Sequence, residues 1–272
     1  MRVSVIVAAY NEEHCIGDCL TTLIRQTHPD FEVTVVDDGS TDKTREIVQS
    51  YSVMLVQGEH RGPAVARNLG AEHASGEILS FLDADMTFDP DYLAKLVAPI
   101  EAGKEIGTFT KDEFVANNDN PWAVCWNINA GLPKGRRYPL DQPDEEPVFR
   151  AILKSVFDSV GGYDDIGYAE DRTISRKLGK NAIYAPGAVC YHSNPGSISE
   201  VYREARWYGK GDQVGKDALT ILRYTLPFSL KNGVIRAYKH REWHYVPFKL
   251  IFDFGVLRGM LSRALSSKNH MK

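Results

Sequence analysis

The feature that most constrains this chain is an alternation of short apolar strands and helical segments through its first 85 residues. Strand-like runs rich in β-branched residues occupy residues 3–9, 31–36, 53–56 and 77–82. Segments with helical spacing or helix-start signals lie between them, at residues 13–26, 40–50 and 63–73. This order is typical of βαβ units with right-handed crossovers. The sequence therefore predicts an α/β fold, with a Rossmann-like, mostly parallel sheet flanked by helices.

Polar clusters follow three of these strands: Tyr10-Asn11-Glu12, Asp37-Asp38 and Asp83-Ala84-Asp85. The carboxyl ends of parallel strands meet at one sheet edge, where ligands bind in open α/β sheets. Two carboxylates at i and i+2 repel each other unless a cation or a hydrogen-bond donor lies nearby. Oxygen ligands suit Mg²⁺ or Mn²⁺, which bind through one or two carboxylates and substrate phosphates. We expect a metal site here, although a bare DxD pattern also recurs without one.

Several other classes of protein are excluded. A dinucleotide-binding fold needs a GxGxxG turn after its first strand, and residues 8–12 contain no glycine; a P-loop motif is also absent. The four cysteines form no CxxC pair, which favours small buried side chains in a reducing compartment. The first ten residues resemble a strand, not a signal peptide, and no run approaches the roughly 20 apolar residues of a membrane span. We therefore expect a cytoplasmic protein.

The net charge of −4 conceals an asymmetry along the chain. Residues 1–200 carry 18 Lys and Arg against 31 Asp and Glu, whereas residues 201–272 carry 14 against 5. A basic tail on an acidic body indicates an anionic partner, either phosphates or a lipid surface. The alternative is an electrostatic match between the tail and its own acidic domain.

Six motifs in a fixed order resemble family 2 inverting glycosyltransferases with the GT-A fold. They are VSVIVAAYNE at 3–12, VVDDGSTD at 35–42, GPAVARNLG at 62–70, DAD at 83–85, GGYD at 161–164 and ED at 170–171. The resemblance spans roughly residues 3–195. It implies a UDP- or GDP-linked sugar donor, transfer to an acceptor hydroxyl with inversion, and dependence on Mn²⁺ or Mg²⁺.

The resemblance places one group of residues around the donor nucleotide: Ala8, Tyr10, Glu12, Asp38, Arg67 and Asp83. Tyr10 is expected to pack near the base, and Asp83 to lie near the ribose or the base. Arg61 competes with Arg67 as the basic residue beside the nucleotide. Ordinary packing is the alternative for Tyr10 and Arg67 when each is considered alone.

The metal and acceptor sides rest on fewer residues. By resemblance, Asp85 binds the metal that bridges the diphosphate, and His192 completes the metal shell as a histidine does in several relatives; a structural histidine is the alternative. Asp171 is the expected general base, and Glu170 could share that role because adjacent carboxylates couple. Many relatives continue this motif with a second acidic residue, whereas Arg172-Thr173 follows here.

The basic tail contains Arg203-Glu204-Ala205-Arg206-Trp207, with the spacing of the QxxRW motif of processive polysaccharide synthases but with Arg in place of Gln. Those synthases carry membrane spans, so a single-addition transferase is favoured. Arg203, Arg206 and Lys210 have helical spacing and could clamp the diphosphate, or form a solvated basic face. Residues 246–265 could lie at a membrane surface, or pack on the catalytic domain or a second subunit.

We thus expect a GT-A catalytic domain at 1–198, followed by a helical basic C-terminal extension at 199–272. Within the domain, residues 1–109 would bind the nucleotide sugar and 110–198 the acceptor, with a loop-rich insertion at 110–147. The expected partners are a nucleotide-sugar donor and a glycan or lipid-linked acceptor, at the cytosolic face of a membrane, and not nucleic acid. The alternatives are a catalytically silent nucleotide-sugar-binding protein and a sugar nucleotidyltransferase, which normally has a glycine-rich loop with a basic residue after its first strand.

Overall fold

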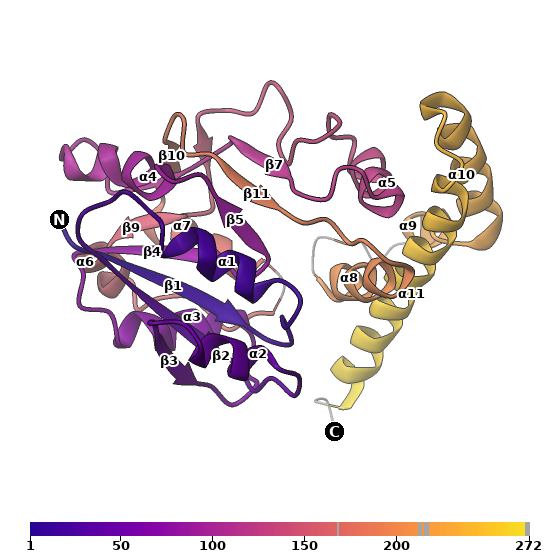
Figure 1. The fold of residues 1–272 in the computed structure, drawn as a ribbon. Coiled ribbons are helices and arrows are strands. Elements are labelled where there is room, and N and C mark those ends of the chain that lie inside the picture. Colours follow the sequence, from indigo (N-terminus) through magenta and orange to yellow (C-terminus); the bar gives the residue numbers. More distant parts are fainter. Residues whose placement is uncertain (168, 212–213, 215–217, 270–272) are drawn as a thin grey trace. The chain divides into compact units, whose positions relative to one another are not determined.

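The computed structural model describes residues 1–167, 169–211, 214 and 218–269, and the contacts within it divide the chain into two units (Figure 1). The first unit comprises residues 1–114 and 140–192. The second comprises residues 115–139 and the residues from 193 onward. Residues 115–139 therefore group with the C-terminal helices.

The first unit is built on an eight-stranded sheet of order β3-β2-β1-β4-β9-β6-β10-β8. Its strands are β1 (Val3–Ala9), β2 (Phe31–Asp37), β3 (Met54–Gln57), β4 (Ile78–Asp83), β6 (Gly107–Phe109), β8 (Glu145–Glu146), β9 (Ala151–Leu153) and β10 (Ala182–Tyr184). The pairs β3-β2, β2-β1, β1-β4 and β6-β10 are parallel. β9 runs antiparallel between β4 and β6. The predicted α/β class and mostly parallel sheet are confirmed.

The helices of this unit are α1 (Ile16–Leu23), α2 (Thr44–Gln49), α3 (Pro63–Glu72), α4 (Tyr92–Glu101), α6 (Lys154–Ser159) and α7 (Thr173–Leu178). Alternate residues of β1 face opposite sides of the sheet. Val5 and Val7 belong to a buried cluster with residues of α1 and α4. Ile6 points the other way, toward Gly70 of α3, where an added Cβ would lie 2.4 Å from the Ile6 side chain. Helices therefore cover both faces.

Two helix starts come later than the sequence predicts. α1 begins at Ile16 and not at residue 13, after a turn. α2 begins at Thr44 and not near residue 40, because the Asp42 carboxylate accepts hydrogen bonds from the Thr44 N–H at 3.0 Å and hydroxyl at 2.6 Å. This local side-chain bonding competes with helix formation in the preceding turn.

The segment at 110–147 is loop-rich as predicted, and it also includes elements that were not predicted from the sequence. It contains β7 (Glu113–Val115) and α5 (Pro121–Ala130). The Asn120 side chain caps α5 by accepting the Trp122 N–H at 2.9 Å, and Gly131 ends it in the left-handed conformation. In a smaller sheet, β11 (Cys190–His192) lies between β5 (Met86–Phe88) and β7.

The second unit consists mainly of helices, as predicted for the basic tail: α5, α8 (Ile198–Lys210), α9 (Ala218–Arg223), α10 (Leu226–His240) and α11 (Tyr245–Asn269). Ser197 caps α8 by accepting the Glu200 N–H at 3.3 Å, and Glu200 in turn accepts the Gly196 N–H at 2.8 Å. Both bonds satisfy backbone N–H groups at the start of the helix. In the described residues, no helix is both long and apolar enough to cross a membrane.

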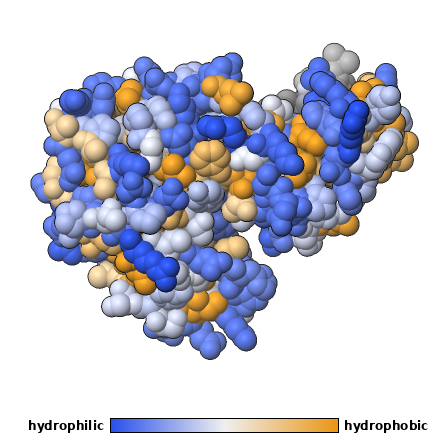
Figure 2. All heavy atoms as spheres, turned by 45° about the horizontal axis from the view of Figure 1, so that its top comes forward, coloured by the Kyte–Doolittle hydropathy of each residue, from blue (hydrophilic) through white to orange (hydrophobic). Residues whose placement is uncertain are grey.

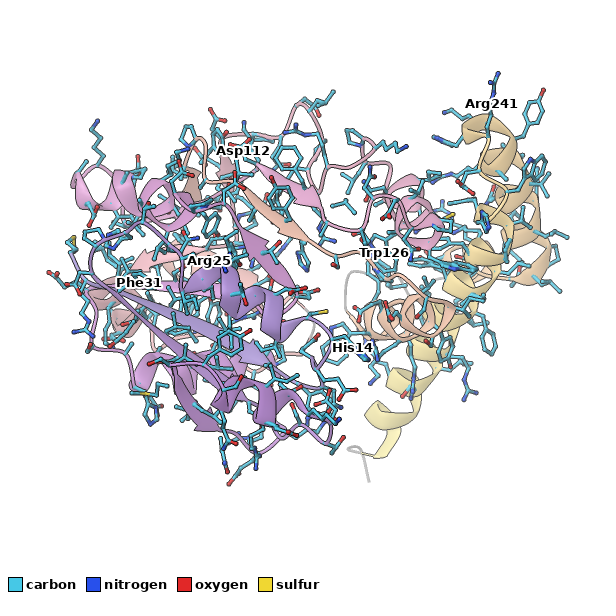
Figure 3. The ribbon with its side chains drawn as sticks, viewed as in Figure 1. His14, Arg25, Phe31, Asp112, Trp126 and Arg241 are labelled. Carbon is cyan, nitrogen blue, oxygen red and sulfur yellow. The ribbon has the colours of Figure 1, made fainter. Side chains whose placement is uncertain are left out.

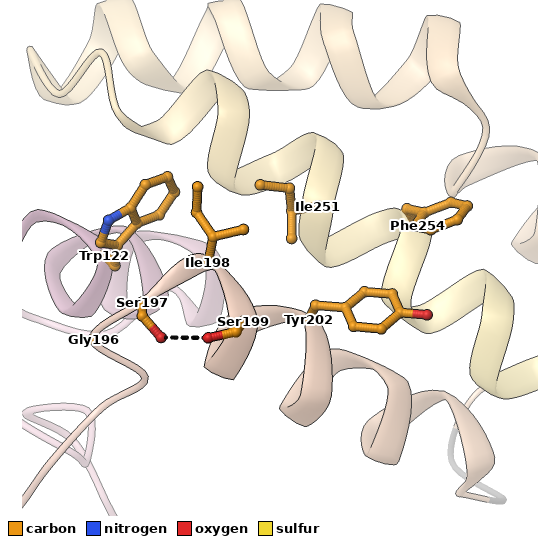
Figure 4. A pocket seen from close by; sticks show the side chains of 8 residues that line it. All are labelled: Trp122, Gly196, Ser197, Ile198, Ser199, Tyr202, Ile251 and Phe254. Atoms are coloured by element: carbon orange, nitrogen blue, oxygen red, sulfur yellow. Dashed lines mark hydrogen bonds between the residues drawn. The ribbon is translucent and has the colours of Figure 1, made fainter.

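Helices α8 and α11 pack with their backbones very close. A Cβ on Gly209 would lie 2.2 Å from the Val256 carbonyl oxygen, and one on Gly259 would lie 2.2 Å from that of Arg206. Beside this contact, a groove of about 760 Å³ is lined by α5, α8 and α11 (Figure 4). Its lining is mostly apolar and aromatic, from Trp122, Ile198, Tyr202, Ile251 and Phe254.

Candidate functional site

The strand ends of the first unit meet as the sequence predicts. Ala9 at the end of β1 pairs with Asp37 of β2, and its neighbour Ala8 pairs with Asp83 of β4. β11 pairs antiparallel with β5, so that His192 lies opposite Met86, the residue after Asp85. Both carboxylates of the DxD motif therefore lie at the same edge of the sheet as the first two strand ends.

A continuous network of charged side chains crosses this edge. Arg67 of α3 donates to Glu170 at 2.7 Å and to Asp83 at 2.9 Å. Arg150 donates to the other oxygen of Asp83, also at 2.9 Å, and its second guanidinium nitrogen lies 3.6 Å from Glu113. Asp83 is thus held between two guanidinium groups, an arrangement that fixes its orientation.

The network continues through His192, whose two ring nitrogens both face carboxylates. Nδ1 lies 2.9 Å from Glu113 and Nε2 lies 3.0 Å from Asp85. A neutral imidazole has one N–H, so it can donate to only one of these two groups. If Nδ1–H donates to the buried Glu113, the Nε2 lone pair faces the Asp85 carboxylate. The lone pair and the negatively charged carboxylate repel each other. A cation bound by both Asp85 and Nε2 would remove this repulsion, while Glu113 orients the imidazole ring.

The charges of the network are strongly coupled. Burial disfavours the ionised form of Asp83, but attraction to Arg150 and Arg67 outweighs it and holds the pKa of Asp83 well below its ordinary value. Burial also opposes the charge of Arg67, and attraction to Asp83 outweighs it and raises the pKa of that guanidinium. For Glu170 the balance is reversed: burial dominates over attraction to Arg67 and raises the pKa of the carboxyl group.

The donor set fits a divalent cation. Asp83, Asp85, Glu113 and Glu170 bring four carboxylates to this network, and Arg67 and Arg150 bring two guanidinium groups, so the network is rich in carboxylate oxygens. Asp85 and His192 offer one oxygen and one nitrogen donor, which Mn²⁺ or Mg²⁺ accepts. Within the described ranges, no three His, Cys, Asp or Glu side chains converge as a complete protein cage.

The residues expected around the nucleotide base lie at the ends of β1 and β2. Tyr10 is exposed and stacks on His60, with ring centroids 4.1 Å apart and planes inclined by 28°. Asp38 is buried, and its carboxylate accepts the N–H groups of Arg61 at 3.0 Å and Gly62 at 2.8 Å. Asp38 therefore holds the loop that leads into α3 beside the aromatic pair.

The remaining predicted donor residues differ in their surroundings. Glu12 lies in the loop after β1, where its N–H donates to Thr44 at 2.7 Å. Arg67 lies inside the charge network, whereas the competing Arg61 is exposed. Arg203 and Arg206 are exposed on α8 of the second unit, as is Lys210, whose ammonium lies over the Trp207 ring. The donor role of these α8 residues stays a prediction.

The two candidate base carboxylates lie in a 3₁₀ turn, Glu170–Arg172, that precedes a regular α-helix. The turn follows Ala169 in the left-handed conformation (φ 65°), and α7 starts only at Thr173. Glu170 is buried and bonded to Arg67, whereas Asp171 is half-buried and forms no ion pair with any described residue. Of the two, Asp171 has the more accessible carboxylate.

Sequence reasoning missed three residues of this site: His60, Glu113 and Arg150. Arg150 precedes the short antiparallel strand β9, and its carbonyl oxygen accepts the Phe81 N–H at 3.0 Å, which sets it beside β4. Glu113 begins β7. Neither residue belongs to a motif, and only the pairing of distant strands brings them to Asp83 and His192. The sequence did carry one general signal. Buried carboxylates of a DxD motif require nearby cations, and a metal-binding histidine requires a hydrogen-bond acceptor that orients its ring.

Comparison with known proteins bears on this arrangement. A family model described as glycosyl transferase family 2 matches residues 4–161. The poly-beta-1,6-N-acetyl-D-glucosamine synthase of Staphylococcus epidermidis is 26% identical over 78% of this chain and 55% of that protein. Glycosyltransferase AglE of Haloferax volcanii is 42% identical over 36% of this chain and 35% of that protein. The matches thus span from about a third to about half of these relatives' own lengths.

Two solved structures share the fold. The mannosyltransferase PcManGT from Pyrobaculum calidifontis, in complex with GDP-Man and Mn²⁺, aligns with 96% of this chain and 87% of that chain, at a TM-score of 0.62 and 22% identity. S. aureus TarS 1-349, in complex with UDP-GlcNAc, aligns with 97% of this chain and 92% of that chain, at a TM-score of 0.58 and 19% identity. The predicted GT-A architecture is confirmed by these likenesses.

Proposed function

The chain belongs to glycosyl transferase family 2, and we propose that it transfers a sugar from a UDP- or GDP-linked donor to an acceptor hydroxyl, with inversion and with a divalent metal ion. The observation that carries this proposal is the charge network of Asp83, Asp85 and His192 at the strand ends. Two neighbours of the same fold were solved with GDP-Man and Mn²⁺ and with UDP-GlcNAc, which supports a nucleotide-sugar donor and a metal.

On the donor side, we propose that Tyr10 and His60 form the platform for the base, and that Ala8, Glu12 and Asp38 line the same pocket. Both residues of the stacked pair are exposed, as a base-binding surface must be. Arg67 and Asp83 orient each other through a hydrogen bond of 2.9 Å. Asp83 is then available near the ribose, and Arg67 supplies positive charge to the pocket.

Asp85 and His192 are the proposed metal ligands. A bound Mn²⁺ or Mg²⁺ would neutralise the charge that develops on the departing diphosphate. Glu113 fixes the imidazole by accepting from Nδ1, which leaves Nε2 free to coordinate. Arg150 in turn lies 3.6 Å from Glu113 and, with Arg67, holds the pKa of Asp83 well below its ordinary value.

Asp171 is the proposed general base. Its carboxylate takes the proton of the acceptor hydroxyl, and the hydroxyl oxygen forms a bond to the anomeric carbon. The bond from that carbon to the diphosphate oxygen breaks at the same time, and its electron pair leaves with the diphosphate. Attack from the face opposite the leaving group inverts the anomeric centre. Glu170 accepts a hydrogen bond from Arg67 at 2.7 Å, and as the adjacent carboxylate it could share the role of the base.

The acceptor is proposed to be a glycan or a lipid-linked glycan, because relatives such as the S. epidermidis synthase are named for polysaccharide synthesis. We retain the proposal that the basic C-terminal helices contact the cytosolic face of a membrane. We also retain residues 1–109 as the donor-binding part and 110–198 as the acceptor part of a catalytic domain at 1–198, with 199–272 as its extension.

The test is nucleotide release from a panel of UDP-, GDP-, CMP- and dTDP-sugars, with Mn²⁺, Mg²⁺ or EDTA. We expect release from one UDP- or GDP-sugar only when metal is present, and loss of release in Asp85→Asn. Tight donor binding without metal, unchanged in Asp85→Asn, would argue for a protein that binds and does not transfer. Pyrophosphate release from a nucleoside triphosphate and a sugar phosphate would indicate nucleotidyl transfer instead.

A further inference from the structure

Helix α10 of the second unit reverses the usual distribution of side-chain sizes. Its inward face carries the small residues Ser229, Gly233 and Ala237, at i, i+4 and i+8, and all three are buried. A Cβ on Gly233 would lie 3.4 Å from Val246 of α11, so these two helices pack closely through that face. Arg236 fixes this orientation by donating to the Ile128 carbonyl of α5 at 2.9 Å.

The outward side of α10 carries large apolar residues. Their exposed fractions run from 41% to 78%, for Leu226, Phe228, Leu230, Val234, Ile235 and Tyr238. Leu230, Val234 and Tyr238 form one stripe at i, i+4 and i+8, and Trp243 continues the surface in the turn after the helix at 62% exposure. A surface helix in water ordinarily shows the opposite pattern, with its large apolar residues buried. We call this set of residues the α10 surface.

Cations accompany the α10 surface and lack counter-charges. Residues 221–248 contain five Lys and Arg residues against one acidic residue, Glu242, which His244 already contacts at 2.7 Å; Lys249, which follows, pairs with Asp253 at 2.7 Å. Lys231, Lys239 and Arg241 form no ion pair with any described residue. Figure 2 shows apolar surface among strongly hydrophilic residues on the C-terminal helices, toward the right of that view.

The end of α10 is shaped as a small polar hollow. About 500 Å³ is lined by Tyr238, Lys239, Arg241 and Trp243. Arg241 ends the helix in the left-handed conformation (φ 55°), and its side chain points outward in Figure 3. Two aromatic rings and two cations around one hollow fit a phosphate group that lies beside hydrocarbon.

We propose that the α10 surface docks on a bilayer that contains anionic phospholipids. The apolar stripe enters the boundary between headgroups and acyl chains, and Tyr238 and Trp243 lie at the headgroup level, where such rings concentrate. Lys239 and Arg241 bind a lipid phosphate in the hollow, and Lys231 extends to the headgroups along its aliphatic stem. This inference rests on the proposed membrane contact, which it makes specific, but not on the proposed transfer reaction.

Composition favours a lipid surface over a protein partner. Lysine is depleted at the core of protein interfaces, whereas Lys231 and Lys239 lie among the exposed apolar residues of α10. An amphipathic helix with Lys and Arg beside bulky apolar side chains is the usual composition of interfacial helices. The unbalanced positive charge complements an anionic bilayer, and it would repel a second copy of the same surface.

The test is co-sedimentation of the full chain with phosphatidylcholine vesicles, alone or with phosphatidylglycerol added, whose anionic headgroups give the bilayer a negative surface potential. We expect binding to the anionic vesicles, weakened by added salt, and little binding to the neutral ones. Lys239→Gln/Arg241→Gln should lower the partition coefficient by about 25-fold, since each cation near the surface contributes roughly a factor of five. Tyr238→Ser/Trp243→Ser should also weaken binding.

Matched controls come from the first unit. Arg25 and Lys104 are exposed cations, and Ile24 and Leu140 are exposed apolar residues. Arg25→Gln/Lys104→Gln and Ile24→Ser/Leu140→Ser should bind vesicles as the parent chain does. Circular dichroism and the melting temperature verify that each variant is folded.

Three results would overturn the docking proposal. They are equal binding to neutral and anionic vesicles, unchanged binding in both α10 variants, and a concentration-dependent dimer that Tyr238→Ser/Trp243→Ser abolishes in the absence of vesicle binding. The assay contains no sugar donor, so its failure leaves the transfer reaction untouched. Failure of donor turnover would equally leave the vesicle result standing.

Discussion

The two units depart from the usual burial of side chains in opposite directions. The first unit buries charge: Asp83, Arg150 and Glu113 lie in a chain of hydrogen bonds and ion pairs at a sheet edge. The second unit exposes apolar surface: α10 keeps Gly233 and Ala237 inside and Leu230 and Val234 outside. Each departure is costly in isolation. Both are therefore places where another molecule is expected, a metal with a diphosphate in one unit and a lipid surface in the other.

The largest effect on activity is expected at Asp171, the proposed general base of the first unit. Asp171→Asn should lower kcat by about 10²- to 10⁴-fold, the usual contribution of a general base. Asp165→Asn is the matched control, since Asp165 is exposed in the same loop region, and it should retain activity. Initial rates of nucleotide release with an accepted acceptor measure both. Equal rates in Asp171→Asn and the parent enzyme would remove Asp171 from the mechanism.

The buried network should also be fragile when one member is removed. Arg150→Met leaves Asp83 and Glu113 without their shared partner in a buried setting, and we expect a loss of about 3–5 kcal/mol in the free energy of unfolding. Arg176→Met removes an exposed guanidinium 3.6 Å from Asp164 and should change stability by less than about 1 kcal/mol. Urea titration compares them, and similar losses in both would contradict a special role for burial.

Orientation of the metal ligand gives a smaller effect. Glu113→Gln keeps the shape of the side chain but weakens the contact of 2.9 Å with His192 Nδ1. We expect Mn²⁺ affinity to fall about 10- to 100-fold, as for other residues that orient a metal-binding histidine. Titration with Mn²⁺ in the presence of UDP or GDP measures this affinity. An affinity equal to that of the parent chain would mean that Glu113 does not position the ring.

A paired carboxylate far from the site provides a pH test. Burial opposes ionisation of Glu32, but hydrogen bonds from Ser4 and Ser75 outweigh it and lower the pKa below its ordinary 4.5. The ionised group therefore stabilises the fold above pH 4.5, and this contribution is lost as the pH falls through the lowered pKa. Glu32→Gln should cost about 1 kcal/mol at pH 7. The difference in the free energy of unfolding between Glu32→Gln and the parent chain should shrink as the pH falls below 4.5. A difference that stays constant with pH would show that ionised Glu32 does not stabilise the fold.

The smallest effect on the free energy of unfolding is expected for substitutions of the exposed apolar residues of α10. Leu230→Ser/Val234→Ser replaces two large apolar residues, yet both are exposed, so the free energy of unfolding should change by no more than about 0.5 kcal/mol per site. Leu20→Ser in the buried cluster of the first unit should be far more costly. Chemical denaturation compares the parent chain, Leu230→Ser/Val234→Ser and Leu20→Ser. A large loss of stability in the α10 variant would show that the outward face of α10 is packed against other residues.

The sequence predicted the parts of the site that are local. Strand ends with acidic residues follow from periodicity and from the geometry of parallel sheets, and these brought Asp37, Asp83 and Asp85 to one edge. α5 was missed because its apolar residues lie on all sides, yet Asn120-Pro121 and Gly131 carried the start and stop signals of a helix. Such signals outweigh an absent amphipathic period.

What the sequence could not predict is the pairing of distant segments. Arg150 reaches Asp83 because a short antiparallel strand enters an otherwise parallel region, and Glu113 reaches His192 through the smaller sheet. No spacing rule encodes either contact. The same limit holds for α10: periodicity predicts an amphipathic helix, but which face is inward depends on its packing against α11.

The measurement that tests the central claim most directly is Mn²⁺ binding, followed by the electron paramagnetic resonance of the free ion, in the presence of UDP or GDP. We expect the parent chain to bind Mn²⁺ more tightly with one of these diphosphates than without it, and Asp85→Asn to lose most of that binding. Asp89→Asn, which changes the acidic residue directly after β5, is the control and should bind normally. Equal Mn²⁺ affinity in the parent chain and Asp85→Asn would contradict the assignment of a metal site at this strand end.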